Sequence, residues 1–189
     1  ARGHAAAADR GDAVVGQLRG HRLACPFLTG WGGTDAPLDG ERAPRPVGAA
    51  QRLPAKTAIA CGATTWTYAE FNALVSRLAA GLNQIGVGEG DKVAVLARNS
   101  HGFAALRFAL ARRGAVMVPI NFMLKAEEVA YILRHAGARL LATDSGLAAL
   151  GRAAAALDTA VRDFVWLPSE DPTEPEPGMG SFHTLADTD

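Results

Sequence analysis

Apolar residues recur at spacings of three and four between residues 68 and 85, a pattern typical of one face of an amphipathic helix. The stripe comprises Phe71, Leu74, Val75, Leu78, Ala79, Leu82 and Ile85. Thr67 and Glu70 precede it with capping-box spacing, in which the hydroxyl accepts a first-turn amide and the carboxylate accepts the amide of the cap residue. Gly86 supplies a left-handed stop, and Val87 can pack back on the last turn. The pattern predicts a helix over 68–85.

After this helix, four short apolar runs have the length and β-branched content of buried strands. They cover residues 92–97, 115–118, 139–143 and 163–167, and Pro119 is expected to stop the second run. Strands of this kind, separated by helix-length segments, predict right-handed crossovers. The expected fold class is therefore α/β, with a largely parallel sheet and helices on its faces.

Three further helices are expected between these strands, each with a start or stop signal. The first is capped by Asn99 or Ser100, and the second starts at Glu127 and Glu128. Asp144 or Ser145 is expected to cap the third, which runs to about residue 156. Gly114 and Gly137 end the first two, and their apolar stripes are Phe103, Leu106 and Leu110, then Val129, Ile132, Leu133 and Ala136.

The chain divides into three segments by composition. Residues 1–52 lack a sustained apolar period and are rich in Gly, Pro, Asp and Arg, so we expect an irregular or disordered lead-in. Residues 53–167 carry the α/β pattern. Residues 168–189 begin with an acidic, proline-rich stretch, which predicts an extended linker followed by a truncated continuation.

Charge and cysteine content exclude several classes of protein. The 189 residues contain 19 Lys+Arg and 19 Asp+Glu, so the formal net charge is zero and the strong basic field of a nucleic-acid binder is absent. No apolar stretch approaches the roughly 18 residues of a membrane span. Cys25 and Cys61 are too few for a disulfide framework and suit a reducing compartment, which predicts a cytoplasmic protein.

Glycine-rich segments do not have the context of a phosphate site. The segment 86–90 (GVGEG) follows a helix and precedes a strand, whereas a dinucleotide or P-loop site needs the reverse order, because the phosphate lies at a helix N-terminus. The segment 29–34 (TGWGGT) has no preceding strand and is expected to be an irregular loop. Lys56, Lys92 and Lys125 follow Ala, Asp and Leu, so no Walker-type loop is present.

Metal and nucleophile motifs are equally weak. His21 and Cys25 could share a helix face, but a metal site needs three or four ligands. His101 and His135 are single histidines near predicted helix ends, where a favourable helix dipole or contact with solvent is the ordinary explanation. No Gly-x-Ser-x-Gly motif is present. The residues therefore predict no catalytic constellation and no metal site.

Several ordered segments nevertheless resemble the N-terminal region of the adenylate-forming superfamily, and within it the AMP-binding acyl-CoA synthetases. The resemblance runs over residues 53–167 and keeps its order and spacing. It rests on Pro54–Ile59, Thr67–Phe71, Gly86-Val87, Gly90–Ala94, Asn99-Ser100, Gly114–Asn121, Glu128 with Tyr131–Leu133, and Ala136–Ala138. One departure is Lys125, which stands where many members have Ser or Thr and so weakens the cap of the following helix.

The resemblance implies a two-step reaction. A fatty or aryl carboxylic acid attacks the α-phosphate of Mg-ATP to give an acyl-adenylate and pyrophosphate, and coenzyme A then displaces AMP. The full-length enzyme would use ATP, Mg²⁺ and coenzyme A. The family's phosphate loop, which ends Pro-Lys-Gly, is absent, since no Lys follows a Pro. The chain is therefore expected to be an inactive N-terminal fragment that binds none of these cofactors well. In acetyl-CoA synthetases, arginines after the third strand contact the coenzyme A phosphate, which makes Arg152 the candidate cofactor-binding residue.

Two alternatives stay open at this point. The chain could be a stand-alone domain that acts by association, for instance with a full-length ligase. It could also belong to an amino-acid or aryl-acid adenylating enzyme that loads a carrier protein. The unpaired sheet edge of an incomplete domain additionally predicts self-association, so a homo-oligomer is possible.

Overall fold

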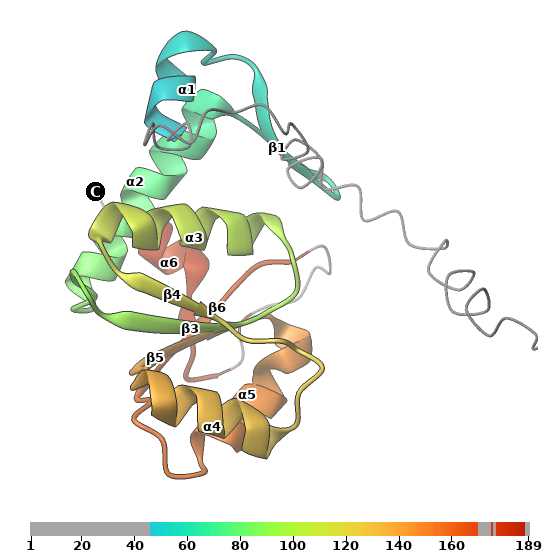
Figure 1. Cartoon of the computed structure of the whole chain (residues 1–189). Coiled ribbons are helices and arrows are strands. Elements are labelled where there is room, and N and C mark those ends of the chain that lie inside the picture. The colour runs from blue at the N-terminus through green and yellow to red at the C-terminus, as the bar shows by residue number, and fades with distance from the viewer. Residues whose placement is uncertain (1–45, 170–174, 176, 188–189) are drawn as a thin grey trace, which may run out of the picture.

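A computed structural model of the chain describes residues 46–169, 175 and 177–187, and its main feature is a five-stranded parallel sheet in the order β4-β3-β5-β6-β7. Its strands are β3 (Lys92–Leu96), β4 (Val116–Pro119), β5 (Leu140–Thr143), β6 (Asp163–Trp166) and β7 (Gly180–Ser181). Figure 1 shows α2 (Tyr68–Gln84), α3 (His101–Arg113) and α6 (Phe182–Ala186) on one face of the sheet, and α4 (Ala126–Ala136) and α5 (Ala148–Ala155) on the other. The predicted α/β class is confirmed.

The central strands are buried on both faces, as expected for a parallel sheet covered by helices. On β3, Val93 and Val95 join the core beneath α2 and α3, while Ala94 and Leu96 join the core beneath α4 and α5. Successive residues of a strand point to opposite faces, so one apolar run supplies both cores. This explains why the strand sequences are continuously apolar.

Helix α2 confirms the predicted capping box. The Thr67 hydroxyl accepts the Glu70 amide hydrogen at 3.3 Å, and the Glu70 carboxylate accepts the Thr67 amide hydrogen at 2.8 Å. The Thr67 hydroxyl also donates a hydrogen bond to this carboxylate at 2.9 Å, and the bonds from the Thr67 amide and hydroxyl to the carboxylate hold the pKa of Glu70 below its usual value. The stabilisation is therefore present at neutral pH and is lost as the pH falls through that lowered pKa. The buried face of α2 matches the predicted apolar stripe except at Ile85, which lies past the helix end and is 43% exposed.

The N-terminal caps of α3 and α4 agree with the sequence prediction. The Ser100 hydroxyl accepts the Phe103 amide hydrogen at 3.1 Å, which selects Ser100 over Asn99 as the cap of α3. At α4, the Glu128 carboxylate accepts the Lys125 amide hydrogen at 2.8 Å, but no side-chain bond comes back from Lys125. The cap of α4 is thus weaker than that of α2, as expected for a Lys at position 125 in place of Ser or Thr.

The three helix-stop glycines all have the left-handed backbone that the sequence predicts. Gly86 has φ +80°, Gly114 φ +71° and Gly137 φ +64°. A Cβ atom at Gly86 would meet no other atom within 4 Å, so any penalty of substitution there arises from the backbone alone. A side chain in this conformation costs roughly 1–2 kcal/mol, and a β-branched one is the least tolerated.

Gly86→Val and Gly114→Val are each expected to lower the free energy of unfolding by about 1–2 kcal/mol. Gly88→Val is the matched control, because Gly88 lies in the same loop without a positive φ and has room for a Cβ atom. Urea unfolding monitored by circular dichroism would measure the three variants. Equal losses for Gly86→Val and Gly88→Val would contradict the assigned stop.

Two N-terminal elements differ from the sequence prediction. Residues 46–52 form helix α1 (Pro46–Arg52), although they fall in the segment expected to be irregular; residues 1–45, with His21, Cys25 and the 29–34 loop, lie outside the described residues. Strands β1 (Thr57–Cys61) and β2 (Thr64–Thr67) form an antiparallel hairpin that was not predicted. Pro46 occupies the first helical position and Gly62 turns the hairpin with φ +56°, so both elements have local signals.

The C-terminal segment is also more ordered than a linker. Strand β7 pairs in parallel with β6, and α6 packs on α2. The Arg77 guanidinium on α2 donates a hydrogen bond to the Ala186 carbonyl at 2.9 Å, which satisfies an orphan acceptor at the end of α6. Residues 180–186 are therefore part of the folded unit, whereas residues 170–174 and 176 of the predicted linker lie outside the described residues.

Strand β4 is an edge of the sheet, since it pairs with β3 alone among the described strands. This position explains why Pro119 is its last residue rather than a stop beyond it, because an edge strand tolerates a missing amide hydrogen. Val116 is 47% exposed there. No helix in the described part of the chain has both the length and the apolarity to cross a membrane.

Candidate functional site

Polar side chains meet at the carboxyl ends of the parallel strands. Arg98 follows β3, Asp144 and Ser145 follow β5, and Trp166 ends β6. From β3 the chain crosses to β4 on one side of the sheet and later to β5 on the other, so the strand order reverses between β3 and β5. Open α/β sheets bind their ligands in the crevice at such a switch point. This carboxyl edge is therefore the candidate functional site.

Arg98 and Asp144 join across the switch point. Asp144 Oδ2 accepts the Arg98 backbone amide hydrogen at 2.9 Å and a bond from Nε at 3.2 Å, while Oδ1 accepts a bond from Nη2 at 3.3 Å. The Asp144 side chain is 1% exposed, whereas the Arg98 side chain is 48% exposed. The carboxylate is thus enclosed by one arginine, and the guanidinium extends from this contact to the surface.

Asp144 and Ser145 do not cap the helix, contrary to the sequence prediction. Asp144 makes no side-chain cap bond, and the segment begins as a short 3₁₀ helix, η2 (Ser145–Leu147), before α5. The Ser145 hydroxyl accepts a hydrogen bond from the Trp166 indole nitrogen at 2.7 Å. Both side chains are therefore used to join neighbouring strand ends, a role that only the sheet order reveals.

Gly146 makes room for this arrangement. A Cβ atom at Gly146 would collide with Nη2 of Arg98 and lie 3.3 Å from Oδ1 of Asp144. A larger residue at 146 would therefore displace the guanidinium from the carboxylate. The ion pair and the glycine together fill the space between the β3 and β5 loops.

The chemistry of this edge is that of a structural network. Its ion pair is neutral as a unit, and the serine hydroxyl already accepts a bond from an indole. Among the described residues, no group of three His, Cys, Asp or Glu side chains could hold a metal ion. We derive no catalytic step through this edge.

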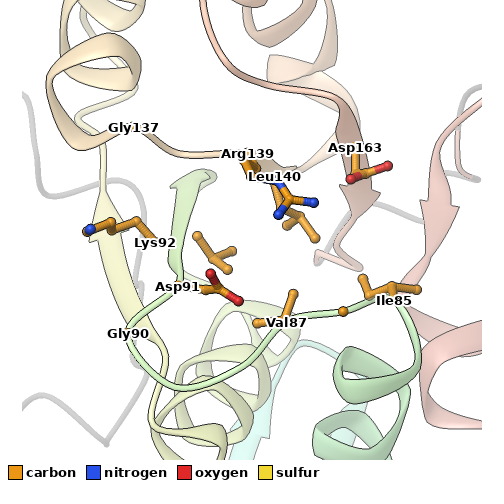
Figure 2. Close-up of a pocket in the computed structure, with 11 residues that line it drawn as sticks. Ile85, Val87, Gly90, Asp91, Lys92, Gly137, Arg139, Leu140 and Asp163 are labelled. Atoms are coloured by element: carbon orange, nitrogen blue, oxygen red, sulfur yellow. The ribbon is translucent and has the colours of Figure 1, made fainter.

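A cavity of about 110 Å³ lies at the opposite edge, where β3, β5 and β6 begin. Figure 2 shows its lining, which includes Asp91, Lys92, Arg139 and Asp163 around apolar side chains. Ligand sites for drug-sized molecules occupy roughly 300–1,000 Å³, so this cavity is too small for a nucleotide or coenzyme A. Residues 86–90 form a loop that leads into β3, as the sequence predicts.

Arg152, the predicted cofactor-binding residue, lies on α5. Its Nη2 donates a hydrogen bond to the Pro177 carbonyl at 2.9 Å, and its guanidinium lies 5.3 Å from the ring centre of Phe164. A cation over an aromatic face is held by the ring quadrupole. The structure thus gives Arg152 a role in fastening the C-terminal segment, and its contact with coenzyme A stays a prediction.

His101 and His135 occupy helix ends, as the sequence predicts. His101 is 8% exposed at the start of α3 and lies edge-on to the Trp66 ring, with centroids 5.3 Å apart. His135 stacks on Tyr131 in the last turn of α4 at 6.0 Å.

The Arg98–Asp144 pair was not predicted from the sequence, although a signal for it exists. Both residues directly follow predicted strands, and the carboxyl ends of parallel strands share one edge of a sheet. What the sequence lacks is the strand order, which decides that β3 and β5 are neighbours. Opposite charges after two strands indicate an ion pair only once that order is known.

The chain resembles known proteins in both sequence and fold. The family model for AMP-binding enzymes matches residues 48–183. Feruloyl-CoA synthase from Amycolatopsis is 43% identical over 96 residues, which cover 51% of this chain and 20% of that protein. Long-chain-fatty-acid–CoA ligase FadD13 from Mycobacterium tuberculosis is 45% identical over 75 residues, covering 40% of this chain and 15% of the ligase.

Solved structures agree with this match. The N-terminal domain of FACL13 from Mycobacterium tuberculosis superposes with a TM-score of 0.60 at 30% identity, over 70% of this chain and 37% of that one. A long-chain-fatty-acid–CoA ligase from Archaeoglobus fulgidus gives 0.65 at 26% identity, over 76% and 29%. The chain thus spans about a fifth or less of the length of the curated relatives quoted above.

Proposed function

Because this chain belongs to the AMP-binding enzyme family, we propose that it is the N-terminal part of an ATP-dependent acyl- or aryl-CoA ligase. The family match over residues 48–183 carries the proposal. In the proposed reaction, a carboxylic acid forms an acyl-adenylate with release of pyrophosphate, and the thiol of coenzyme A then displaces AMP. Fatty and aryl acids are the proposed substrates, supported by relatives that include feruloyl-CoA, benzoate–CoA and long-chain-fatty-acid–CoA ligases.

The proposed contribution of this chain is structural. Its parallel sheet and the Arg98–Asp144 contact hold the β3 and β5 loops in fixed positions at the carboxyl edge. We propose that the 189-residue chain alone forms no acyl-adenylate, because its sequence has no loop ending Pro-Lys-Gly to hold the phosphates of ATP. The groups that bind ATP, Mg²⁺ and coenzyme A would belong to the remainder of the ligase.

Sequencing the DNA that follows the codon of Asp189 tests the proposal. We expect an open reading frame that encodes a loop rich in Ser, Thr and Gly and ending Pro-Lys-Gly, because this loop holds the phosphates of ATP in the family that the chain resembles. An in-frame stop codon directly after Asp189 would overturn the proposal that the chain is part of a longer ligase.

A carrier protein is the second candidate acceptor for the acyl group. The observation in its favour is the fatty acid–[acyl-carrier-protein] ligase ScoC from Streptomyces coeruleorubidus, 38% identical over 92 residues. Both candidates share the adenylate, so pyrophosphate exchange cannot separate them. Single-turnover transfer from the acyl-adenylate of the full-length protein would, with coenzyme A and a phosphopantetheinyl carrier protein offered in parallel; transfer to coenzyme A alone supports the first candidate.

A further inference from the structure

The outward face of α4 presents an aromatic side chain to solvent. Tyr131 is 63% exposed at the middle of the helix and stacks on His135, with ring centroids 6.0 Å apart. The opposite side of the helix is buried at Val129, Ala130 and Leu133. Figure 1 shows α4 and α5 together on one face of the sheet, with no further labelled element over them. Within the described part of the chain, the outward face of α4 is therefore uncovered.

Acidic and basic side chains are arranged symmetrically about Tyr131. Glu127 and Glu128 lie four and three positions before it in the sequence. Arg134 and His135 lie three and four positions after it, and all four side chains are exposed. With 3.6 residues per turn, each of the four lies within about 60° of Tyr131 around the helix axis. One half of the face is therefore acidic, and the other half carries the arginine and the histidine.

This arrangement makes the face complementary to itself. If two copies of α4 pack antiparallel about a two-fold axis through Tyr131, a position three residues before Tyr131 in one copy meets the position three residues after it in the other. Glu128 then faces Arg134 of the second copy, and Glu127 faces His135 of the second copy. Each contact occurs twice, because the interface is isologous, and the two Tyr131 rings meet at its centre. Parallel packing would instead place like charges opposite each other, which is unfavourable.

The hydrogen bonds that Glu128 and Arg134 make within the chain are compatible with such a contact. Glu128 Oε2 accepts the Lys125 amide hydrogen at 2.8 Å, and Arg134 Nη1 donates to the Leu157 carbonyl at 2.6 Å. Glu128 Oε1 and Arg134 Nη2 are not used in these two bonds. Among the described residues, no ion pair joins Glu128 or Arg134 to another side chain. Both residues can therefore form an ion pair with a second copy without losing their present bonds.

We propose that the 189-residue chain forms a homodimer in which two copies of α4 pack antiparallel about Tyr131. The aromatic side chains at the centre would supply most of the binding energy, and the charged pairs around them would fix the orientation. Helix α4 has 11 residues and is about 16 Å long. A contact of this length buries less than the roughly 1,200 Å² of a standard interface, so the dimer is weak. The interface is distinct from the β4 edge and independent of the proposed ligase chemistry.

Sedimentation velocity of the 189-residue chain over a dilution series tests the proposal, with two charge reversals as probes of the orientation. In the dimer, Glu128→Arg places arginines opposite each other and Arg134→Glu places carboxylates opposite each other. Each variant alone is therefore expected to dimerise at least about tenfold more weakly than the unmodified chain. In an equimolar mixture, position 128 of each variant faces an opposite charge at position 134 of the other. The mixed dimer should therefore recover the affinity of the unmodified chain.

Two further variants complete the experiment. Tyr131→Ala should weaken the dimer by about tenfold or more, because the aromatic contact at the centre is lost. Arg107→Glu is the matched control and should leave the affinity unchanged, since Arg107 is exposed on α3, on the opposite face of the sheet. Thermal melts verify that every variant folds, because Glu128→Arg removes the bond to the Lys125 amide.

Three results would overturn the proposal. The first is a chain that sediments as a monomer at concentrations up to roughly 1 mM. The second is a dimer that folded Arg134→Glu or folded Tyr131→Ala does not weaken. The third is a mixture of the two folded charge-reversal variants that dimerises no better than either variant alone.

Discussion

Asp144→Ala is expected to lower the free energy of unfolding by about 2–3 kcal/mol. The carboxylate is 1% exposed and accepts both the Arg98 backbone amide hydrogen and two guanidinium bonds. Its removal takes away the acceptor of that amide hydrogen and the carboxylate that faces the guanidinium. The value is lower than for a fully buried pair, because water reaches half of the Arg98 side chain.

Asp144→Asn separates the contribution of the hydrogen bond to the Arg98 backbone from that of the ion pair with its guanidinium. The amide oxygen can still accept the Arg98 backbone hydrogen, while the ion pair is lost, so we expect a smaller destabilisation of about 1 kcal/mol. Urea unfolding monitored by circular dichroism measures both variants. If Asp144→Ala is as stable as the unmodified chain, the enclosed ion pair does not hold the β3 and β5 loops together.

Gly81→Val should release the C-terminal segment from α2. A Cβ atom at Gly81 would collide with the Leu185 carbonyl oxygen and lie 2.8 Å from the Leu185 Cα atom, so backbone rather than a flexible side chain obstructs it. Overpacking of this kind costs typically 1–3 kcal/mol, and we expect about 3 kcal/mol here because neither backbone can yield by rotation.

Hydrogen exchange locates this effect. In Gly81→Val, the amides of residues 182–187 should lose protection while those of β3 and β5 keep it, because α6 makes most of its contacts with α2, whereas β3 and β5 are paired with each other and with further strands. Gln84→Val is the matched control, since Gln84 is exposed on the same helix. Retained protection at residues 182–187 in Gly81→Val would show that α6 does not dock closely on α2.

Elements with local signals were the ones predictable from the sequence. The α2 capping box and the stops at Gly86, Gly114 and Gly137 depend on residues within a few positions of one another, and the structure confirms them. The hairpin 57–67 has a comparable signal, since Ile59 and Cys61 are two positions apart and Gly62 follows them. The structure buries both side chains and gives Gly62 a positive φ, but strands this short were not predicted.

The parts that were missed depend on contacts between distant segments. Residues 180–186 follow an acidic, proline-rich stretch and have too few residues to form a stable helix by propensity alone. They are held by Gly81 and Arg77 of α2, about 100 positions earlier in the chain. Asp144 likewise has the composition of a helix cap, and only its proximity to Arg98 in space explains its actual partner.

We propose that residues 48–183 form the start of a working adenylate-forming domain. A chimera in which they replace the matching segment of the FadD13 ligase tests it directly, with fatty-acid-dependent exchange of pyrophosphate into ATP as the measurement. We predict that the folded chimera catalyses this exchange, whereas the ligase lacking the segment does not. A chimera that melts cooperatively yet exchanges no pyrophosphate would contradict the proposal.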